Sequence, residues 1–452
     1  MITDQKLHMD YQTMTELEIM PGEGSGMSIL EILNKTITPG GGDMIRKVFR
    51  TPFSQKDEII QRQESLKYIM KNHGNLDLHE FRKIMDRVEY YYYSKAESAT
   101  TNHPLGIFIE GLFYMIKFKE YRRTINKGTR ITIHFISRLS SYLKRNISSD
   151  MPYYLSLKFN EISAILRSAG ISKLTKKDPS GVWTLGELFL YDKTFRDTNK
   201  KEMIKMIHFI YELDVLVAMA KAVEEYGLVF PEIIDSAKPE IKVKGLYHLF
   251  LSNPVGNSTE FRNGKNFLFL TGPNMSGKTT FLKSCGIAVF LAHLGMGVPA
   301  KSMRLTTFQS LFSSLNTSDN LTLGYSYFYS EVIRIRKAAE NLRKHHRSFM
   351  IFDELFKGTN IKDAFDGSLL VIEGLMKWKT GLFILSSHLL ELESEIRKYP
   401  NVFFQHFDSD VINGKPDFKF GLHDGISKER LGLLILKNEK IDELLEPDNP
   451  EQ

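Results

Sequence analysis

The segment GPNMSGKTT, at residues 272–280, has the residue types and spacing of a phosphate-binding loop. It fits the pattern G-x-x-x-x-G-K-[ST] with Gly272, Gly277, Lys278 and Thr279. Glycines let successive backbone N–H groups point at one anion, and the helix after such a loop adds the positive end of its dipole. We expect Lys278 to reach the β- and γ-phosphates of a bound ATP and Thr279 to bind its Mg²⁺. The residues predicted to surround the phosphates are Gly272, Pro273, Asn274, Met275, Ser276, Gly277, Lys278, Thr279 and Thr280.

Two acidic residues and one histidine follow two later apolar runs. Asp353 and Glu354 come directly after the apolar residues 349–352. We predict that Asp353 holds Mg²⁺ through its water shell and that Glu354 polarises the water that attacks the γ-phosphate. His388 follows the run at 381–387 and is a candidate sensor of the γ-phosphate, with a purely structural histidine as the alternative.

Strands and helices must bring these residues together. The runs 267–270, 348–353 and 381–387 have the length of buried parallel strands, and each precedes a helix or a polar loop. A helix is expected at about 278–294 and another at 327–343. This alternation predicts an α/β domain in which the strand ends, and the residues on them, meet at one edge of a sheet.

Residues 28–230 have a different pattern, which is typical of helices. The longest amphipathic stretch covers about 199–226, where Met203, Ile207 and Ile210 recur at helical spacing. Pro39 and the three glycines after it are expected to interrupt the helices. The fold class predicted from these two patterns is a multidomain chain, with an all-α region followed by an α/β domain.

Length, charge and cysteine content limit the remaining possibilities. A chain of 452 residues is too long for one ordinary core. A single cysteine, Cys285, suits a reducing, cytoplasmic location, and no apolar run is long enough for a membrane span. The net charge of +6 is mild, but residues 114–146 contain nine basic residues and one acid. From this run we take Arg122, Arg123, Arg130 and Lys144 as candidate DNA-phosphate contacts, with a solvated helix face as the alternative.

A polar segment at 318–326, SDNLTLGYS, precedes the helix expected at 327–343. On spacing alone it fits a second phosphate site and an ordinary capped loop equally well. Its sequence, however, belongs to a larger set of similarities. GPNMSGKTT resembles the phosphate-binding loop of the MutS/MSH family, with Ser276 where glycine is usual. SDNLTLGYS, FDELFKGTN and SSHLLEL resemble the same family's later motifs, and Asp10, Thr13 and Leu17 resemble the opening of its core domain.

This resemblance implies a fold, a cofactor and partners. It implies a core/lever domain at 1–240, an ABC-type ATPase domain at 241–440 and a disordered tail at 441–452. ATP and Mg²⁺ are the implied cofactors, and a homodimer with composite sites is the implied assembly. Phe250 is implied to stack on adenine, and Ser326 to reach the γ-phosphate of the partner's ATP. The family's mismatch-binding and connector domains are expected to be absent, and no membrane partner is expected.

The function implied by the resemblance is an ATP-dependent clamp on distorted, branched or mismatched double-stranded DNA, acting in repair or recombination. Closure on ATP is expected to draw the lever helices together around the DNA. The alternative is a nucleotide-switched scaffold that binds a protein or ribosomal partner. Charge reversal in the basic run separates the two hypotheses, since only the first predicts that DNA binding is lost.

Overall fold

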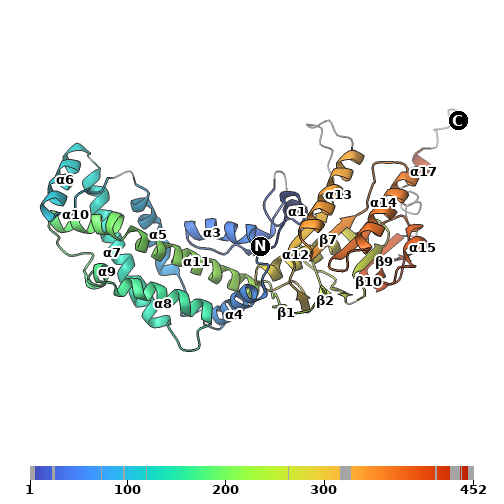
Figure 1. Ribbon diagram of the computed structural model, residues 1–452, viewed down its shortest axis with the longest axis horizontal. Helices are drawn as coiled ribbons and strands as arrows, with labels where there is room; N and C mark the ends of the chain where they lie inside the picture. Colours follow the sequence, from blue (N-terminus) through green and yellow to red (C-terminus); the bar gives the residue numbers. More distant parts are fainter. Residues whose placement is uncertain are drawn as a thin grey trace, which may run out of the picture. The chain divides into compact units, whose positions relative to one another are not determined.

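The computed structural model describes residues 6–22, 26–72, 74–94, 97–118, 120–262, 264–315, 327–412, 415–427, 438 and 440–445. The chain folds into two compact units, whose elements are labelled in Figure 1. Unit 1 consists of Met1–Ile32, Thr51–Ile60 and Glu225–Gln452, and unit 2 consists of Leu33–Arg50 and Gln61–Glu224. This division differs from the expected domains at 1–240 and 241–440, because Met1–Ile32 belongs to the same compact unit as Glu225–Gln452.

Unit 1 contains a six-stranded sheet with the strand order β10-β9-β4-β8-β7-β6. The β9–β10 pair is antiparallel, and all other neighbours are parallel. The three runs expected as strands are β4, β7 and β8. The strands are β4 (Phe267–Thr271), β6 (Ser310–Ser314), β7 (Ser348–Asp353), β8 (Leu382–Ser386), β9 (Val402–Ile412) and β10 (Lys415–Asp424).

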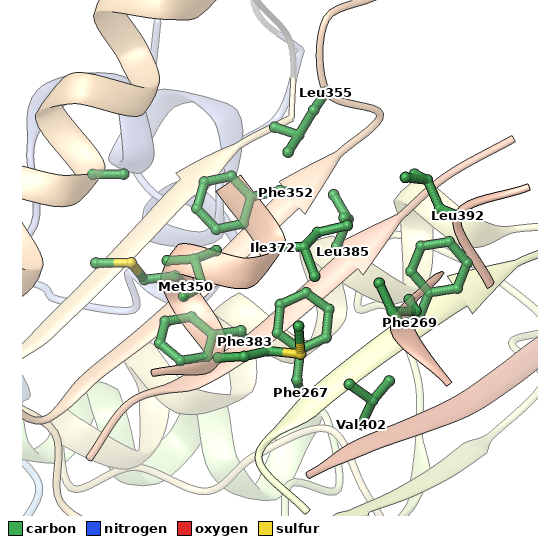
Figure 2. Close-up of a cluster of buried hydrophobic side chains, with 14 of the residues drawn as sticks. Phe267, Phe269, Met350, Phe352, Leu355, Ile372, Phe383, Leu385, Leu392 and Val402 are labelled. Carbon is green, nitrogen blue, oxygen red and sulfur yellow. The ribbon is translucent and has the colours of Figure 1, made fainter. Parts of the chain in front are cut away.

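Helices cover both faces of this sheet. On one face, α12 (Lys278–His293) packs so closely that a Cβ at Gly286 would lie 3.2 Å from Ile351 of β7. On the other face, α13 (Tyr327–Lys344), α14 (Ile361–Met376) and α15 (Leu392–Ile396) share an apolar core with the strands. Figure 2 shows Ile372 of α14 among phenylalanines of β4, β7 and β8. Because both faces are covered, β4, β7 and β8 are buried along their whole length.

A second, four-stranded sheet in unit 1 has the order β1-β5-β2-β3. Thr259 of β3 donates to the side chain of Gln405 of β9 at 2.8 Å, which joins the two sheets. The helix α1 packs against β6. The remaining elements of unit 1 are α1 (Tyr11–Glu16), α2 (Ile29–Leu33), β1 (Glu232–Ile234), β2 (Ile241–Leu246), β3 (Asn257–Phe261), β5 (Ser302–Thr306) and α17 (Ile441–Leu444).

Unit 2 is helical, as the sequence predicts. The long helix α7 buries one stripe against α5, where the ring of Phe81 contacts Phe135 and Tyr142. Across the part of the chain that the structure describes, none of the helices combines the length and hydrophobicity needed to cross a bilayer. The elements are α3 (Pro39–Arg50), α4 (Lys56–Asn72), α5 (His79–Tyr92), α6 (Pro104–Lys117), α7 (Tyr121–Asn146), α8 (Tyr153–Arg167), α9 (Ala169–Ser172), η1 (Leu174–Lys176), α10 (Leu185–Lys193), η2 (Thr194–Thr198) and α11 (Lys200–Glu225).

The expected break at Pro39 is wrong, because Pro39 begins α3 and the three glycines lie within it. Proline is tolerated at a first helical position, where its missing N–H has no partner in any case. The glycines permit a close crossing: a Cβ at Gly40 would lie 2.2 Å from the ring of Tyr211 on α11. Thr38 caps α3, since its hydroxyl accepts from the N–H of Gly41 at 3.1 Å, and Asp214 on α11 holds Thr38 by accepting from its N–H (2.8 Å) and its hydroxyl (2.6 Å).

Candidate functional site

The loop between β4 and α12 has the backbone that its glycines require. Gly272 and Gly277 adopt φ values of 147° and 101°, which favour glycine. A Cβ at Gly272 would lie 3.0 Å from the hydroxyl of Ser276 and 3.1 Å from the carbonyl oxygen of Phe407. The loop therefore closes tightly around its own backbone, and α12 begins directly after it at Lys278.

The side chain of Lys278 turns back into this loop. Its Nζ donates to the carbonyl oxygens of Gly272 and Pro273, both at 2.9 Å, and lies 3.5 Å from Nε2 of His388. The residue is only 6% exposed. Burial lowers the pKa of Lys278, and the negative charges of Glu354 and Asp353 oppose that effect. A lysine amine buried at the loop is suited to an anionic ligand.

Asp353 meets Thr279 at the carboxyl edge of the sheet. The parallel register pairs Asp353, at the end of β7, with Ser386 at the end of β8. The carboxylate accepts hydrogen bonds from the hydroxyls of Thr279, at 2.6 Å, and Ser386. In the described ranges no three His, Cys, Asp or Glu side chains cluster as a metal site. The Asp353 carboxylate beside the Thr279 hydroxyl fits Mg²⁺, which usually takes one or two protein oxygens and completes its shell with waters and phosphates.

Glu354 and His388 form an ion pair next to Lys278. Nε2 of His388 lies 2.8 Å from Oε1 of Glu354, and Nζ of Lys357 lies 3.3 Å from Oε2. Burial by itself raises the pKa of Glu354, but the hydrogen bond and charge of His388 and the charge of Lys357 outweigh it and hold that pKa at about 2. Glu354 is therefore ionised at neutral pH, as a group that orients a water molecule needs to be.

A cavity of about 450 Å³ opens over the loop. Phe250, predicted to stack on adenine, does not line it; the ring of Phe250 packs instead on His248, with centroids 5.0 Å apart. Apolar contacts to the cavity come from Leu251, Val255, Phe407 and Phe420. The position of Phe250 therefore does not support stacking on adenine, although its neighbours His248 and Leu251 line the cavity.

Phe420 is a cavity residue that the sequence analysis missed. It lies on β10 where the register with β9 shifts, and it has a φ of 53°. Asn257 of β3 holds this irregularity on both sides, since its amide donates to the carbonyl of Phe420 at 3.0 Å and its oxygen accepts from the N–H of Leu422 at 2.8 Å. The ring lies over the loop, 3.4 Å from a Cβ built at Gly277. In the sequence, FKFGLHD shows only an alternating strand pattern.

The basic run of unit 2 forms α7, and its four candidate residues differ in what they contact. Arg122, Arg123 and Lys144 are exposed, with Arg123 at 3.9 Å from Glu120. Arg130 is half-buried and donates to the carbonyl oxygens of Pro179 (2.7 Å) and Gly181 (2.9 Å). Its guanidinium also lies over the ring of Trp183, 4.2 Å from the centroid. Arg130 thus fastens a loop of its own unit and has few donors left for a phosphate.

Ser326, the predicted trans contact, lies outside the described residues, as do residues 446–452 of the predicted tail. Three of the other loop residues line the cavity, namely Asn274, Met275 and Thr280. Pro273 and Ser276 contact the loop itself. Among them Met275 is 75% exposed with a φ of 65°. The hydroxyl of Ser276 is buried and has no hydrogen-bond partner in the described part of the chain.

Comparison with known proteins matches both units to one family. The family model of MutS domain III matches residues 12–151, and that of MutS domain V matches residues 268–444. This chain belongs to the MutS family. The match to domain V covers the loop, both acidic residues at the end of β7 and His388, and the match to domain III covers most of α1 and the first helices of unit 2.

MutS-family relatives align with much of the chain. It is 24% identical to a DNA mismatch repair protein MutS of Persephonella marina, covering 96% of this chain and 59% of that protein. It is 30% identical to the DNA mismatch repair protein MutS of Anaplasma phagocytophilum over 50% of this chain, and 31% identical to the human MutS protein homolog 4 over 51%. The chain spans 27% and 26% of those two proteins. It therefore covers less than two thirds of the length of each of these MutS-family relatives.

Proposed function

We propose that this chain is a Mg²⁺-dependent ATP hydrolase that acts as a switch on DNA. The observation that carries the proposal is the meeting of Lys278, Thr279, Asp353, Glu354 and His388 at one edge of one sheet. These side chains come from three strand ends separated by up to 110 residues in the sequence. Such a set has little value for stability alone, because it buries a lysine and two carboxylates together.

Each residue has a role that its contacts support. The N–H groups of the loop and Nζ of Lys278 bind the phosphates, and the apolar residues of the cavity contact the base. Thr279 and Asp353 hold Mg²⁺, which neutralises charge on the phosphates when it is bound. Glu354 orients the attacking water, and His388 fixes the carboxylate of Glu354 close to Lys278. An ABC-type fold with two composite sites, completed by Ser326 of a second copy, is part of this proposal.

The proposed substrate of the switch is double-stranded DNA with a distorted, branched or mismatched structure. The relatives named as mismatch repair proteins and the exposed Arg122, Arg123 and Lys144 support it. The alternative, a scaffold with a protein or ribosomal partner in the cytoplasm, is favoured by one observation: Arg130 is engaged within its own unit, which reduces the free charge on α7.

The test combines hydrolysis and DNA residence in one variant. Glu354→Gln keeps the size of the side chain and removes its charge, so we expect ATP to bind and turnover to fall by on the order of 100-fold or more. The ATP-bound form should then accumulate as a dimer and dissociate more slowly from a four-way junction than the unaltered chain does. If DNA does not change ATP turnover and nucleotide does not change DNA affinity at any salt concentration, the DNA switch is refuted and the scaffold hypothesis remains.

A further inference from the structure

The backbone that follows Asp353 is in an unfavourable conformation. Glu354 and Phe356 adopt φ values of 53° and 61°, in the left-handed region that side chains other than glycine rarely occupy. Such a conformation persists only where the surroundings hold it. The side chain that needs this turn is Glu354, whose carboxylate must stay beside His388 and Lys357.

The first turns of α13 hold that turn. The ring of Phe328 packs on Phe356, with centroids 5.7 Å apart. Glu331 is 6% exposed; burial raises the pKa of its carboxyl, and the neighbouring backbone N–H groups of Lys357, Gly358 and Phe356 lower it. These three residues lie two to four positions after Glu354, so the position of α13 fixes the backbone that continues from Glu354.

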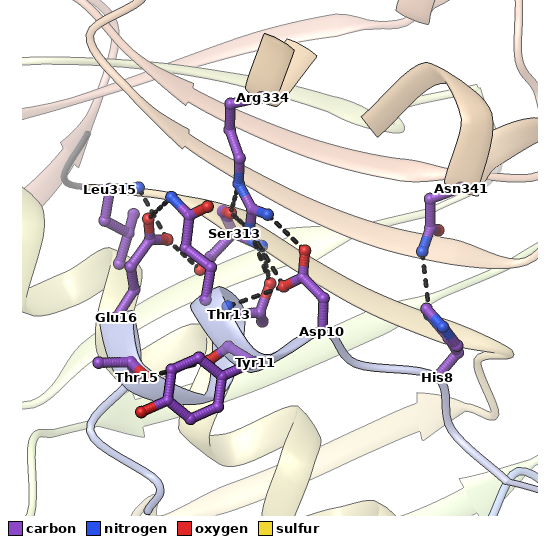
Figure 3. Close-up of polar contacts among 11 residues, drawn as sticks. His8, Asp10, Tyr11, Thr13, Thr15, Glu16, Ser313, Leu315, Arg334 and Asn341 are labelled. Atoms are coloured by element: carbon purple, nitrogen blue, oxygen red, sulfur yellow. Dashed lines mark hydrogen bonds and ion pairs between the residues drawn. The ribbon is translucent and has the colours of Figure 1, made fainter. Parts of the chain in front are cut away.

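The next turn of α13 is itself fixed by a buried polar cluster. Arg334 is 3% exposed and follows Glu331 by three residues, which places both on one face of the helix. Figure 3 shows its guanidinium held from two sides. It forms an ion pair with Asp10, donates from Nη2 to the hydroxyl of Thr13 at 2.9 Å, and donates from Nε to the carbonyl of Ser313 at 3.0 Å.

Glu16 completes the cluster from the other end of α1. It accepts hydrogen bonds from the hydroxyl of Ser313 and from the N–H of Leu315, the latter at 3.0 Å (Figure 3). Ser313 lies near the end of β6 and Leu315 directly follows that strand, which is a parallel neighbour of the strand that ends in Asp353. The cluster therefore fastens α1, β6 and α13 together at the sheet edge where Glu354 lies.

Stability alone does not account for these charges. The cluster buries the carboxylate of Glu16 and the guanidinium of Arg334, with Asp10 half-buried beside them, and one oxygen of Glu331 is buried with no hydrogen-bond partner among the described residues. Buried charges of this kind usually cost stability relative to apolar packing. None of these side chains lines the cavity over the loop, so none is placed to touch a nucleotide there.

We propose that Glu331 and Arg334 are positioning residues for Glu354. Glu331 holds the strained backbone after Glu354, and Arg334, anchored by Asp10, Thr13 and Ser313, holds the helix that presents Glu331. The proposal rests on the proposed hydrolysis of ATP and adds to it the residues that keep the water-orienting carboxylate in place. Loss of either contact lets Glu354 leave its position while the loop at 272–280 remains intact.

The test separates turnover from nucleotide binding in the full chain. For Glu331→Ala and for Arg334→Lys we expect kcat to fall at least about 10-fold, because small misplacements of a catalytic group have effects of that size. The Kd for ADP and the KM for ATP should stay within about 3-fold, since the nucleotide cavity is not altered. Glu331→Gln, which keeps an acceptor oxygen, should recover part of kcat. Amide hydrogen exchange at 356–358 should become faster in Glu331→Ala.

The matched control is Glu340→Ala, which removes an exposed partner of Arg336 on the same helix. It should leave kcat, Kd and exchange unchanged. If the unaltered chain hydrolyses ATP and Glu331→Ala hydrolyses it as fast as Glu340→Ala does, the positioning role is refuted and the proposed ATP hydrolysis is not. If kcat, ADP affinity and Tm fall in parallel, the role is merely structural and the inference also fails. If the unaltered chain and Glu340→Ala both lack turnover, the proposed function and this inference fail together.

Discussion

Replacing Phe420 with alanine should weaken nucleotide binding more than replacing Phe250. The ring of Phe420 is 44% exposed, lines the cavity and lies over Gly277 of the loop, so a base in the cavity has an aromatic face to stack on. The ring of Phe250 packs on His248 outside the lining. Both variants remove the same number of atoms, and only one removes them from the cavity.

The size of the effect follows from the stacking energy. Stacking of a base on an aromatic side chain is worth about 1–3 kcal/mol. Part of the Phe420 ring already contacts its neighbours, so the lower part of this range, about 1–2 kcal/mol, is expected, which corresponds to a roughly 5- to 30-fold rise in Kd. For Phe250→Ala we expect less than about a 2-fold change, since no cavity contact is lost.

The assay is a fluorescence titration with a labelled ADP, followed by competition with unlabelled ADP. Asn257→Ala is a third variant. It keeps the Phe420 side chain but removes the amide that bonds the backbone of Phe420 and Leu422 at the register shift of β10. It should raise Kd by a smaller factor than Phe420→Ala. A larger effect of Phe250→Ala than of Phe420→Ala, or no effect of Phe420→Ala at all, contradicts the assignment of the base to this side of the cavity.

Three further predictions concern charged side chains. The pKa of Glu354 is about 2 against an ordinary 4.5, so its ionised form stabilises the fold above pH 4.5 and this contribution disappears as the pH falls towards 2. The unaltered chain should therefore exceed Glu354→Gln in unfolding free energy by on the order of 2 kcal/mol above pH 4.5. Urea unfolding should show this difference becoming smaller between pH 4.5 and pH 2. Asp214→Ala removes the acceptor that holds Ile37 and the capping residue Thr38, and should cost about 1–3 kcal/mol of unfolding free energy, whereas Asp43→Ala, in an exposed pair with Arg46, should change little. Charge reversal of Arg122, Arg123 and Lys144 together should weaken duplex binding and reduce its salt dependence. Arg130→Ala should mainly lower Tm. If both changes reduced duplex affinity equally, the structural role given to Arg130 would be contradicted.

The sequence predicted the phosphate loop and the strand ends because local pattern determines both. The glycine spacing of 272–280 predicts a phosphate loop, and the apolar runs before Asp353 and His388 predict buried strands, in any parallel sheet. The helical character of unit 2 was also predictable from spacing. Pro39 was misinterpreted because its glycines serve a helix crossing with α11, and no local pattern contains the partner helix.

The contacts that the sequence did not predict join residues far apart in the chain. Phe420 reaches the cavity through a register shift that Asn257 stabilises from another strand, 163 residues away. Arg334 is one of several arginines on an amphipathic helix, and only its pairing with Asp10 distinguishes it from Arg336. Properties of this kind arise from tertiary packing, which periodicity and spacing do not describe.

The pairing of Asp10 with Arg334 also sets an order for folding during synthesis. Unit 1 is assembled from three chain segments, with unit 2 inserted between them. Asp10 leaves the ribosome 324 residues before its partner, a delay of roughly 15–65 s at ordinary rates of translation. During that interval α1 has no β6 or α13 to pack on, whereas residues 61–224 are already complete. The helical unit is therefore expected to fold first and the nucleotide site last, after the ends of this discontinuous unit have met.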